Sequence, residues 1–189
     1  MALAAFFHTL ASTYSQAGSP LYLSAGTGNQ PPRFNISKIQ HVYGIESNQA
    51  FAPTLDAKIK ETGFEGAYTP VICHVEDAEI ELTRLGVMPG TVDCILSVQL
   101  LCSVKDLAGV VKKLHHLLKL GGELIFWEHQ RNEVDFVTRM VLGLWNIIWT
   151  PLQTRETLLS VADWEVIELD VDEGPRGIMP QVWGRLKKM

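Results

Sequence analysis

Cysteine is scarce in this chain, and none of it is arranged to bind a metal ion. Cys73, Cys94 and Cys102 stand within apolar runs of the 189-residue sequence, without a C-x-x-C pair and without a histidine at ligand spacing. An odd number of such cysteines is typical of buried thiols in a reducing compartment. We therefore expect no metal site and a cytoplasmic location.

Long hydrophobic runs and clusters of positive charge are also missing. A membrane-spanning helix needs about 20 consecutive apolar residues, whereas the most apolar segment, 136–152, is interrupted by Arg139. Lysine and arginine are scattered and the net charge is -5, which argues against a nucleic-acid surface. The N-terminus lacks the basic start of a signal peptide. We expect a short amphipathic helix within 1–19, no transmembrane segment and no nucleic-acid partner, and leave a homo-oligomer open.

What the chain does contain is an alternation of strand-like and helix-like segments. Its 189 residues, 47% of them hydrophobic, are enough for one buried core and too few for two ordinary domains. The alternation predicts a parallel sheet covered by helices on both faces. The fold class is therefore α/β: one doubly wound domain over 20–189, with a mainly parallel seven-stranded sheet whose last two strands include an antiparallel one.

The expected elements follow from apolar periodicity and from turn residues. Strands are predicted at 20–24, 41–45, 70–74, 92–97, 123–128, 163–171 and 178–186, and helices at 49–62, 77–85, 105–119 and 135–149 and after Pro151. Gly121 and Gly122 are expected to end the helix at 105–119.

Ligands of such a sheet bind at the carboxyl ends of its strands. A glycine loop at 25–28 follows the first strand, and Glu46 ends the second strand, twenty positions after Gly26. This spacing suits a carboxylate that accepts hydrogen bonds from ribose hydroxyls, and a solvated carboxylate is the alternative. Glu76 and Asp77 follow the third strand, where adenine contacts are often made, and helix capping is the alternative for Asp77. The predicted cofactor-binding residues are Gly26, Gly28, Asn29, Glu46, Glu76 and Asp77.

Four segments, in this order and spacing, resemble class I S-adenosylmethionine-dependent methyltransferases. They are the glycine loop, VYGIESN, GTVDCILSVQLLCSV and LHHLLKLGGELIFWEHQRN. The match is closest to the methyltransferase-like family 7 proteins and their fungal relatives, includes the late PQVWG, and covers about residues 20–189. The resemblance implies a Rossmann-like sheet and S-adenosylmethionine as the cofactor.

The first motif of that family, which resembles E-x-G-x-G-x-G, is degenerate here. Tyr22 takes the acidic position and Ser24 the first glycine. Loss of a charge-assisted hydrogen bond costs about 1.5–3 kcal/mol, and a side chain at a left-handed position costs about 1–2 kcal/mol. Together these losses would weaken cofactor binding by about a hundredfold to a thousandfold. We therefore expect an enzyme that needs no cofactor, although S-adenosylmethionine can still bind.

Apolar and aromatic side chains are expected to form a substrate pocket. The predicted lining residues are Tyr14, Leu100, Trp127, Phe136, Met140, Trp145 and Trp149, together with Phe6 and Phe7. For any single aromatic residue, a place in the core is the alternative. Gln99 and His129 follow the fourth and fifth strands and are the predicted catalytic residues, and a core or surface position is the alternative for His129.

Three functions are compatible with these features, and the motif loss favours the first. It is a cofactor-independent cyclisation of a small lipophilic substrate in specialised metabolism, of the Diels–Alder type. Such a pericyclase gains up to about 7–11 kcal/mol from positioning, and a donor to a carbonyl adds a few more. The second is methyl transfer to a small lipophilic thiol or hydroxyl, with His129 or Glu128 as the base. The third is a non-catalytic binding subunit with the N-terminal helix as its interface.

Overall fold

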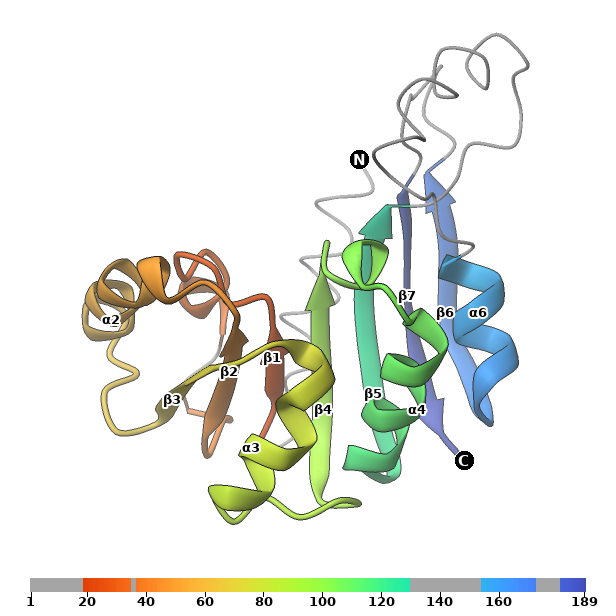
Figure 1. The fold of residues 1–189 in the computed structure, drawn as a ribbon, viewed down its shortest axis with the longest axis horizontal. Helices are drawn as coiled ribbons and strands as arrows, with labels where there is room; N and C mark the ends of the chain where they lie inside the picture. Colours follow the sequence, from red (N-terminus) through yellow and green to blue (C-terminus); the bar gives the residue numbers. More distant parts are fainter. Residues whose placement is uncertain (1–18, 35–36, 130–153, 173–180) are drawn as a thin grey trace, which may run out of the picture.

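One seven-stranded sheet organises the protein in the computed structural model, which describes residues 19–34, 37–129, 154–172 and 181–189 (Figure 1). The strands are β1 (Leu21–Leu23), β2 (Val42–Glu46), β3 (Tyr68–Ile72), β4 (Val92–Val98), β5 (Leu118–His129), β6 (Trp164–Asp172) and β7 (Gln181–Lys188). Their order is β3-β2-β1-β4-β5-β7-β6. Strands β1 to β5 are parallel, and β7 runs antiparallel to both β5 and β6. The predicted α/β fold with a mainly parallel seven-stranded sheet is confirmed.

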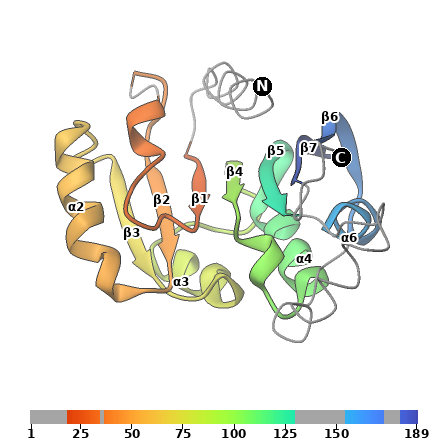
Figure 2. The ribbon, with the colours of Figure 1, turned by 90° about the horizontal axis from the view of Figure 1, so that it is seen from above.

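Helices cover both faces of this sheet (Figure 2). The α-helices are α2 (Ala52–Glu61), α3 (Ala78–Arg84), α4 (Leu107–Leu117) and α6 (Thr154–Val161), and the 3-10 helices are η1 (Pro31–Arg33), η2 (Gln49–Phe51), η3 (Val75–Asp77) and η4 (Leu101–Ser103). Side chains of α3, α4 and α6 share one hydrophobic core, and those of α2 share the other. None of the helices in the described part of the chain is long and apolar enough to span a bilayer. The helices predicted within 1–19 and at 135–149 lie outside the described residues.

Alternation along β1 sends neighbouring side chains into different cores. Leu21 and Leu23 pack into the core beneath α3 and α4, whereas Tyr22 faces the core beneath α2. Phe34 lies edge-on to the Tyr22 ring, with 6.0 Å between the ring centroids. It is also edge-on to Phe64 at 6.0 Å. The connection from β1 to β2 therefore packs through aromatic rings, and the only helix in its described residues is the single turn of η1.

The helix at 105–119 ends earlier than predicted, and its glycines have another role. Helix α4 stops at Leu117, and the chain enters β5 at Leu118 without a glycine. Gly121 has a φ of +73°, and the β4–β5 register shifts between Val92 and Cys94. The glycine pair therefore lies at an irregularity within β5. A side chain at Gly122 would approach the Val92 carbonyl to 3.1 Å, which explains the lack of one.

Gly44 of β2 is required because the Tyr68 ring lies against it. A Cβ at Gly44 would overlap the Tyr68 hydroxyl and ring. Tyr68 is only 7% exposed, so its ring has little room to move away. Close packing of this kind makes added volume costly.

We expect Gly44→Ala to lower the free energy of unfolding by about 1–3 kcal/mol because it overpacks the α2-side core. Chemical denaturation of the single variants and of Gly44→Ala with Tyr68→Leu would measure the coupling between the two sites. Gly86→Ala is the control for coupling: its Cβ meets no atom within 4 Å, so the backbone strain at its φ of +86° should simply add to the effect of Tyr68→Leu. Additive effects of Gly44→Ala and Tyr68→Leu would refute the steric explanation.

Candidate functional site

A cavity of about 150 Å³ lies at the carboxyl ends of β1 to β4. Its wall is formed by Ser24, Ile45, Glu46, Ser47, Cys73, His74, Val75, Glu76, Leu100, Ser103 and Val104. The structure thus brings together three of the predicted site residues, Glu46, Glu76 and Leu100. The strand order reverses between β1 and β4, which is where open α/β sheets bind ligands.

Glu46 ties the glycine loop to the end of β2. Its Oε2 accepts a hydrogen bond from the Gly26 amide at 2.7 Å, and its Oε1 accepts one from the Asn48 amide at 2.8 Å. The side chain is only 7% exposed, yet it forms part of the cavity wall. Each carboxylate oxygen has a second lone pair, so both can still accept from ligand hydroxyls. This role as a loop anchor is one that the sequence pattern does not reveal.

The glycine loop has a left-handed backbone at three positions. The φ angles are +58° at Ser24, +52° at Gly26 and +81° at Gly28. Gly28 is also closely packed, because a Cβ there would lie 3.0 Å from the Lys58 side chain and 3.1 Å from Leu55. Ser24 therefore has a side chain where the backbone favours glycine, at a cost of about 1–2 kcal/mol. Asn29 is exposed and does not line the cavity.

Tyr22 offers no negative charge in place of the acidic residue of the first motif. Its side chain is 3% exposed and faces the α2-side core, whereas the cavity lies on the side of α3 and α4. Burial raises the pKa of the phenol well above its usual range, and the nearby Glu46 charge raises it further. The ring is therefore neutral. A glutamate at this position would bury a second carboxylate near Glu46, so Tyr22→Glu would not restore the motif cleanly.

The two predicted catalytic residues lie next to each other at the ends of β4 and β5. Gln99 Nε2 is 3.5 Å from His129 Nε2, and the Sγ of Cys102 is 3.5 Å from His129 Nδ1. Burial lowers the pKa of His129 below its usual 6.5, so the ring is neutral at pH 7. Gln99 has a left-handed φ of +55°, and its neighbour Leu100 lines the cavity. Strained backbone of this kind is concentrated at functional sites.

Glu128 is part of the framework and does not reach a substrate. It is fully buried, and burial raises the pKa of its carboxyl group. Its Oε1 accepts from Ser97 Oγ at 2.6 Å and from the Leu100 amide at 3.3 Å. Its Oε2 accepts from the Cys102 amide at 3.2 Å. The suggested role of Glu128 as a base is therefore wrong, and the residue instead holds the turn of η4 against β5.

Only part of the predicted substrate pocket can be placed. Leu100 lies in the cavity wall. Trp127 is 9% exposed, belongs to the α2-side core, and donates from Nε1 to Gln181 Oε1 at 2.8 Å. The other predicted lining residues lie outside the described ranges: Phe6, Phe7, Tyr14, Phe136, Met140, Trp145 and Trp149. An aromatic substrate pocket therefore stays a prediction.

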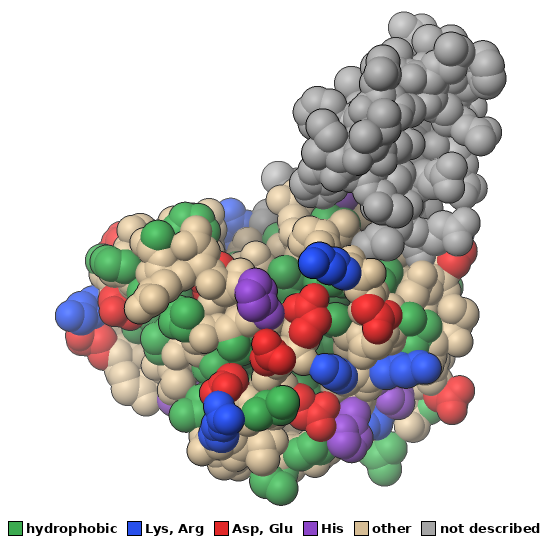
Figure 3. Space-filling model, viewed as in Figure 1, with side chains coloured by type: hydrophobic (Ala, Val, Ile, Leu, Met, Phe, Trp, Pro, Cys, Tyr) green, Lys and Arg blue, Asp and Glu red, His purple; other side chains and the backbone are tan. Residues whose placement is uncertain are grey.

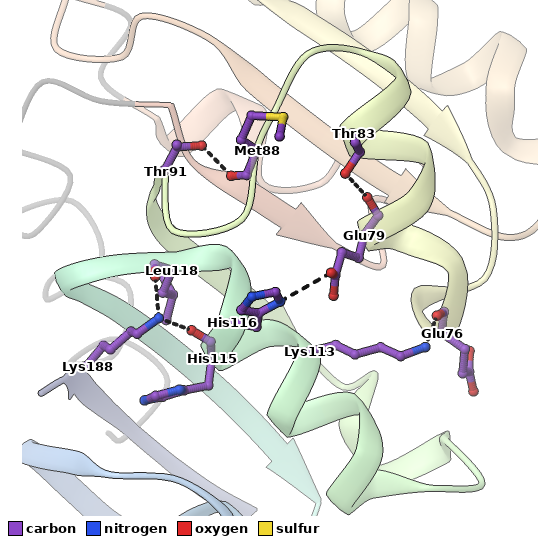
Figure 4. Close-up of polar contacts among 10 residues, drawn as sticks. All are labelled: Glu76, Glu79, Thr83, Met88, Thr91, Lys113, His115, His116, Leu118 and Lys188. Carbon is purple, nitrogen blue, oxygen red and sulfur yellow. Dashed lines mark hydrogen bonds and ion pairs between the residues drawn. The ribbon is translucent and has the colours of Figure 1, made fainter.

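Side chains of helix α4 make polar contacts with η3 and α3 (Figure 4). Lys113 Nζ donates to the Glu76 carbonyl at 2.6 Å, and His116 Nδ1 is 3.2 Å from Glu79 Oε1 on α3.

Asp77 stands at the start of α3 but makes no capping hydrogen bond, so the capping alternative is wrong. The visible face over α3 and α4 mixes acidic, basic and histidine side chains (Figure 3). In the described ranges, no group of three or more His, Cys, Asp or Glu is placed to hold a metal ion.

A profile described as a methyltransferase domain matches residues 21–126, which contain every residue of the cavity wall. The chain belongs to the methyltransferase domain family. Comparison with curated protein sequences found no match. Solved structures of proteins with low sequence identity to this chain have the same fold.

Three of these structures illustrate the range of the methyltransferase fold. The YcgJ protein of Bacillus subtilis is 12% identical with a TM-score of 0.73, covering 98% of each chain. Geranyl diphosphate C-methyltransferase of Streptomyces coelicolor is 14% identical with a TM-score of 0.73, covering 98% of this chain and 78% of that one. The 4+2 cyclase SpnF is 14% identical with a TM-score of 0.70, covering 95% of this chain and 80% of that one. At these identities the likeness concerns the fold alone.

The wall of the cavity contains residue types that suit the nucleoside half of S-adenosylmethionine. Glu46 presents buried acceptor atoms of the kind that bind ribose hydroxyls. Glu76 and Leu100 offer a polar edge and an apolar wall to a base. The amino-acid half of the cofactor fits less well, because Tyr22 is neutral and faces the other core.

We expect Ser24→Gly to raise the free energy of unfolding by about 1 kcal/mol, because glycine adopts the left-handed backbone without strain. Ser24→Ala is the matched control, since it removes the hydroxyl and keeps the strain. Thermal denaturation of both variants would separate the two effects. Equal stability of the glycine and alanine variants would contradict the expectation.

Proposed function

We propose that the protein is an S-adenosylmethionine-dependent methyltransferase that acts on a small lipophilic thiol or hydroxyl compound. The observation that supports this most strongly is Glu46, a buried carboxylate that retains acceptor sites in the wall of a cavity at the strand ends. Such a group has no use in a cofactor-free reaction beyond holding the loop. The narrower assignment to methyltransferase-like family 7 is part of this proposal.

S-adenosylmethionine, when bound, supplies an electrophilic methyl group to a nucleophilic sulfur or oxygen atom. The contribution of His129 is to remove the proton from that atom, and a ring that is neutral at pH 7 can accept it. The side-chain amide of Gln99 lies 3.5 Å from Nε2 of His129 and orients the imidazole ring. Glu46 binds the ribose, and Glu76 and Leu100 border the base.

Cofactor-independent cyclisation is the second candidate, and the residues at positions 22 and 24 favour it. The first motif has lost its charge at Tyr22 and has a strained serine at position 24, both of which weaken cofactor binding. The fold of SpnF shows that this architecture is compatible with a cyclase. In that reaction Gln99 or His129 would donate a hydrogen bond to a substrate carbonyl, and Glu46 would be dispensable.

Removal of the Glu46 carboxylate tests which function applies. We expect Glu46→Ala to weaken binding of S-adenosylhomocysteine by about 10–100-fold, because a charge-assisted hydrogen bond contributes about 1.5–3 kcal/mol. Isothermal titration measures this loss, with Asp56→Ala as the control that removes an exposed carboxylate on α2. Thermal denaturation checks that both variants are folded.

Turnover with and without the cofactor then separates the candidates. Methylation of small lipophilic thiols that depends on added S-adenosylmethionine supports the proposal. Conversion of a linear polyene precursor that proceeds without the cofactor, and is unaffected by Glu46→Ala, would replace it with cyclisation.

The pH dependence of methyl transfer should show an acid limb below pH 6.5. A base must be unprotonated to act, so activity falls as the pH drops through its pKa, and burial lowers the pKa of His129 below its usual 6.5. Cys102 does not titrate in this range, because burial raises its pKa to about 12. Measuring kcat/KM against pH for the native protein and for His129→Gln checks the assignment to His129. An acid limb that persists in His129→Gln would come from another titrating group.

A further inference from the structure

We propose that residues 1–18 form a helix that packs on the face of β4, β5 and β7 turned away from α3 and α4. The packing is independent of the proposed function. It follows from an apolar sheet face that none of the described helices covers, and from the position at which the chain enters the sheet.

The sheet face in question is apolar and buried. Leu96 of β4 and Ile125 of β5 lie side by side in the register, and both are 0% exposed. Trp127 of β5 and Trp183 of β7 are also paired, and they are 9% and 6% exposed. All four side chains belong to the α2-side core. Side chains buried to this extent must lie beneath another part of the chain.

Helix α2 cannot cover these strands. Its buried side chains are Leu55 and Ile59, and Leu55 lies beside Gly28 in the loop after β1. Neighbouring strands are about 4.8 Å apart, so β5 is about 10 Å and β7 about 14 Å from β1. A helix is about 10 Å across and covers about two strands. Figure 2 shows α2 beside β2 and β3 and away from β5 and β7.

The other described helices lie on the opposite face. Side chains of α3, α4 and α6 pack into the other core, beneath Leu21 and Leu23 of β1. The cover of β4, β5 and β7 must therefore come from a segment outside the described ranges.

Residues 1–18 join the sheet at its amino edge, where the parallel strands begin. The Ser19 amide donates to Asp93 Oδ2 at 2.7 Å, which fixes the chain beside the first residues of β4. A helix that precedes this point can run back along β4 and β5 toward their carboxyl ends.

The two longer internal segments outside the described ranges start and end at the other edge. Segment 130–153 follows His129 and leads to Thr154, whose hydroxyl donates to the His129 carbonyl at 3.2 Å. It leads into α6, on the opposite face. Segment 173–180 joins β6 to β7 at residues that are paired with each other. Residues 1–18 are thus the segment best placed to cover the face.

The sequence of this segment has the apolar pattern that such a position requires. Its larger apolar residues recur at spacings of three and four positions, and they include Leu3, Phe7, Leu10 and Tyr14. This spacing places them on one side of a helix. Ser12 lies on the opposite side, and Gly18 is typical of the position after a helix end.

The lengths of helix and strand agree with this placement. A helix that ends at residue 17, beside residue 93, rises about 1.5 Å per residue, whereas a strand rises about 3.3 Å per residue. Leu10 and Leu96 are then both about 10 Å from the amino edge, and Phe7 and Val98 both about 15–16 Å from it. Leu10 should therefore face Leu96 and its neighbour Ile125.

This register places the start of the helix at the carboxyl edge of the sheet. His129 ends β5 there, and it is on the same face as Trp127 because side chains two positions apart in a strand share a face. The first turn of the helix then adds apolar surface near the proposed base, which suits a lipophilic substrate. This benefit to a substrate rests on the proposed function, whereas the packing itself does not.

Methyl NMR of the full-length protein tests the contact directly. In a deuterated sample with protonated leucine and isoleucine methyl groups, we expect a nuclear Overhauser effect between Leu10 and Ile125. The variants Leu10→Ala and Ile125→Val assign the two signals. The same spectrum should show no such effect between Leu10 and Leu114, which is buried in α4 on the opposite face.

An equilibrated mixture of leucine-labelled and isoleucine-labelled protein identifies the occupant. An effect that is present in the doubly labelled sample and absent from the mixture supports the proposal. An effect that persists in the mixture would assign the face to a second copy of the chain. No effect in either sample would assign it to another segment or partner. Each of the last two results would overturn the proposal.

Thermal unfolding provides the second readout. Leu10→Ala should lower the midpoint by about 5–10 °C, because it removes a buried side chain. Ser12→Ala is the matched control on the opposite side of the helix and should change the midpoint little. Equal midpoints for Leu10→Ala and the native protein, or equal losses in the two variants, would contradict packing through Leu10. The spectra and the midpoints need neither cofactor nor substrate, so a protein that does not methylate would leave the packing intact.

Discussion

The pair of hydrogen bonds that Glu46 accepts is the contact on which the site depends. One carboxylate oxygen holds the Gly26 amide and the other holds the Asn48 amide, so the end of β2 is fastened to the loop after β1. The Ala25 amide adds a bond to the Ile45 carbonyl at 3.0 Å. Because the loop is held from β2, it keeps a left-handed backbone even at Ser24, which is not a glycine. The shape of the loop therefore does not depend on a glycine at position 24.

A second carboxylate performs a similar task three strands away. Glu128 gathers a hydroxyl and two amides around the start of η4, just as Glu46 gathers two amides around the glycine loop. The two groups differ in what they face. Glu46 borders the cavity, whereas Glu128 is fully enclosed and bonds the backbone amides of Leu100 and Cys102. Two neighbouring halves of the site are thus each organised by one acidic side chain at a strand end.

Periodic features could be predicted from the sequence, and features set by distant contacts could not. The alternation of apolar strands with helical segments was enough to predict the sheet, its antiparallel last strand, and the position of Glu46 at the strand ends. The two glycines at 121 and 122 were misjudged because a glycine after an apolar helix normally marks its end, while here the register with β4 requires them. The role of Glu128 depends on Ser97 and Cys102, about 30 positions earlier, and no local pattern reveals such a pairing. Gly44 is similar, because its reason is the Tyr68 ring on the next strand.

The left-handed backbone at Ser24 and Gln99 also has a consequence for chirality. An L-residue at such a position brings its Cβ close to the following carbonyl oxygen, whereas the mirror-image residue adopts the same φ without this crowding. The ends of β1 and β4 are therefore two positions where the fold would accept a D-amino acid more readily than the L-amino acid that it contains. A chain assembled by chemical ligation with D-serine at position 24 would keep the hydroxyl group and release the strain, though its hydroxyl would point in a different direction from that of the natural residue.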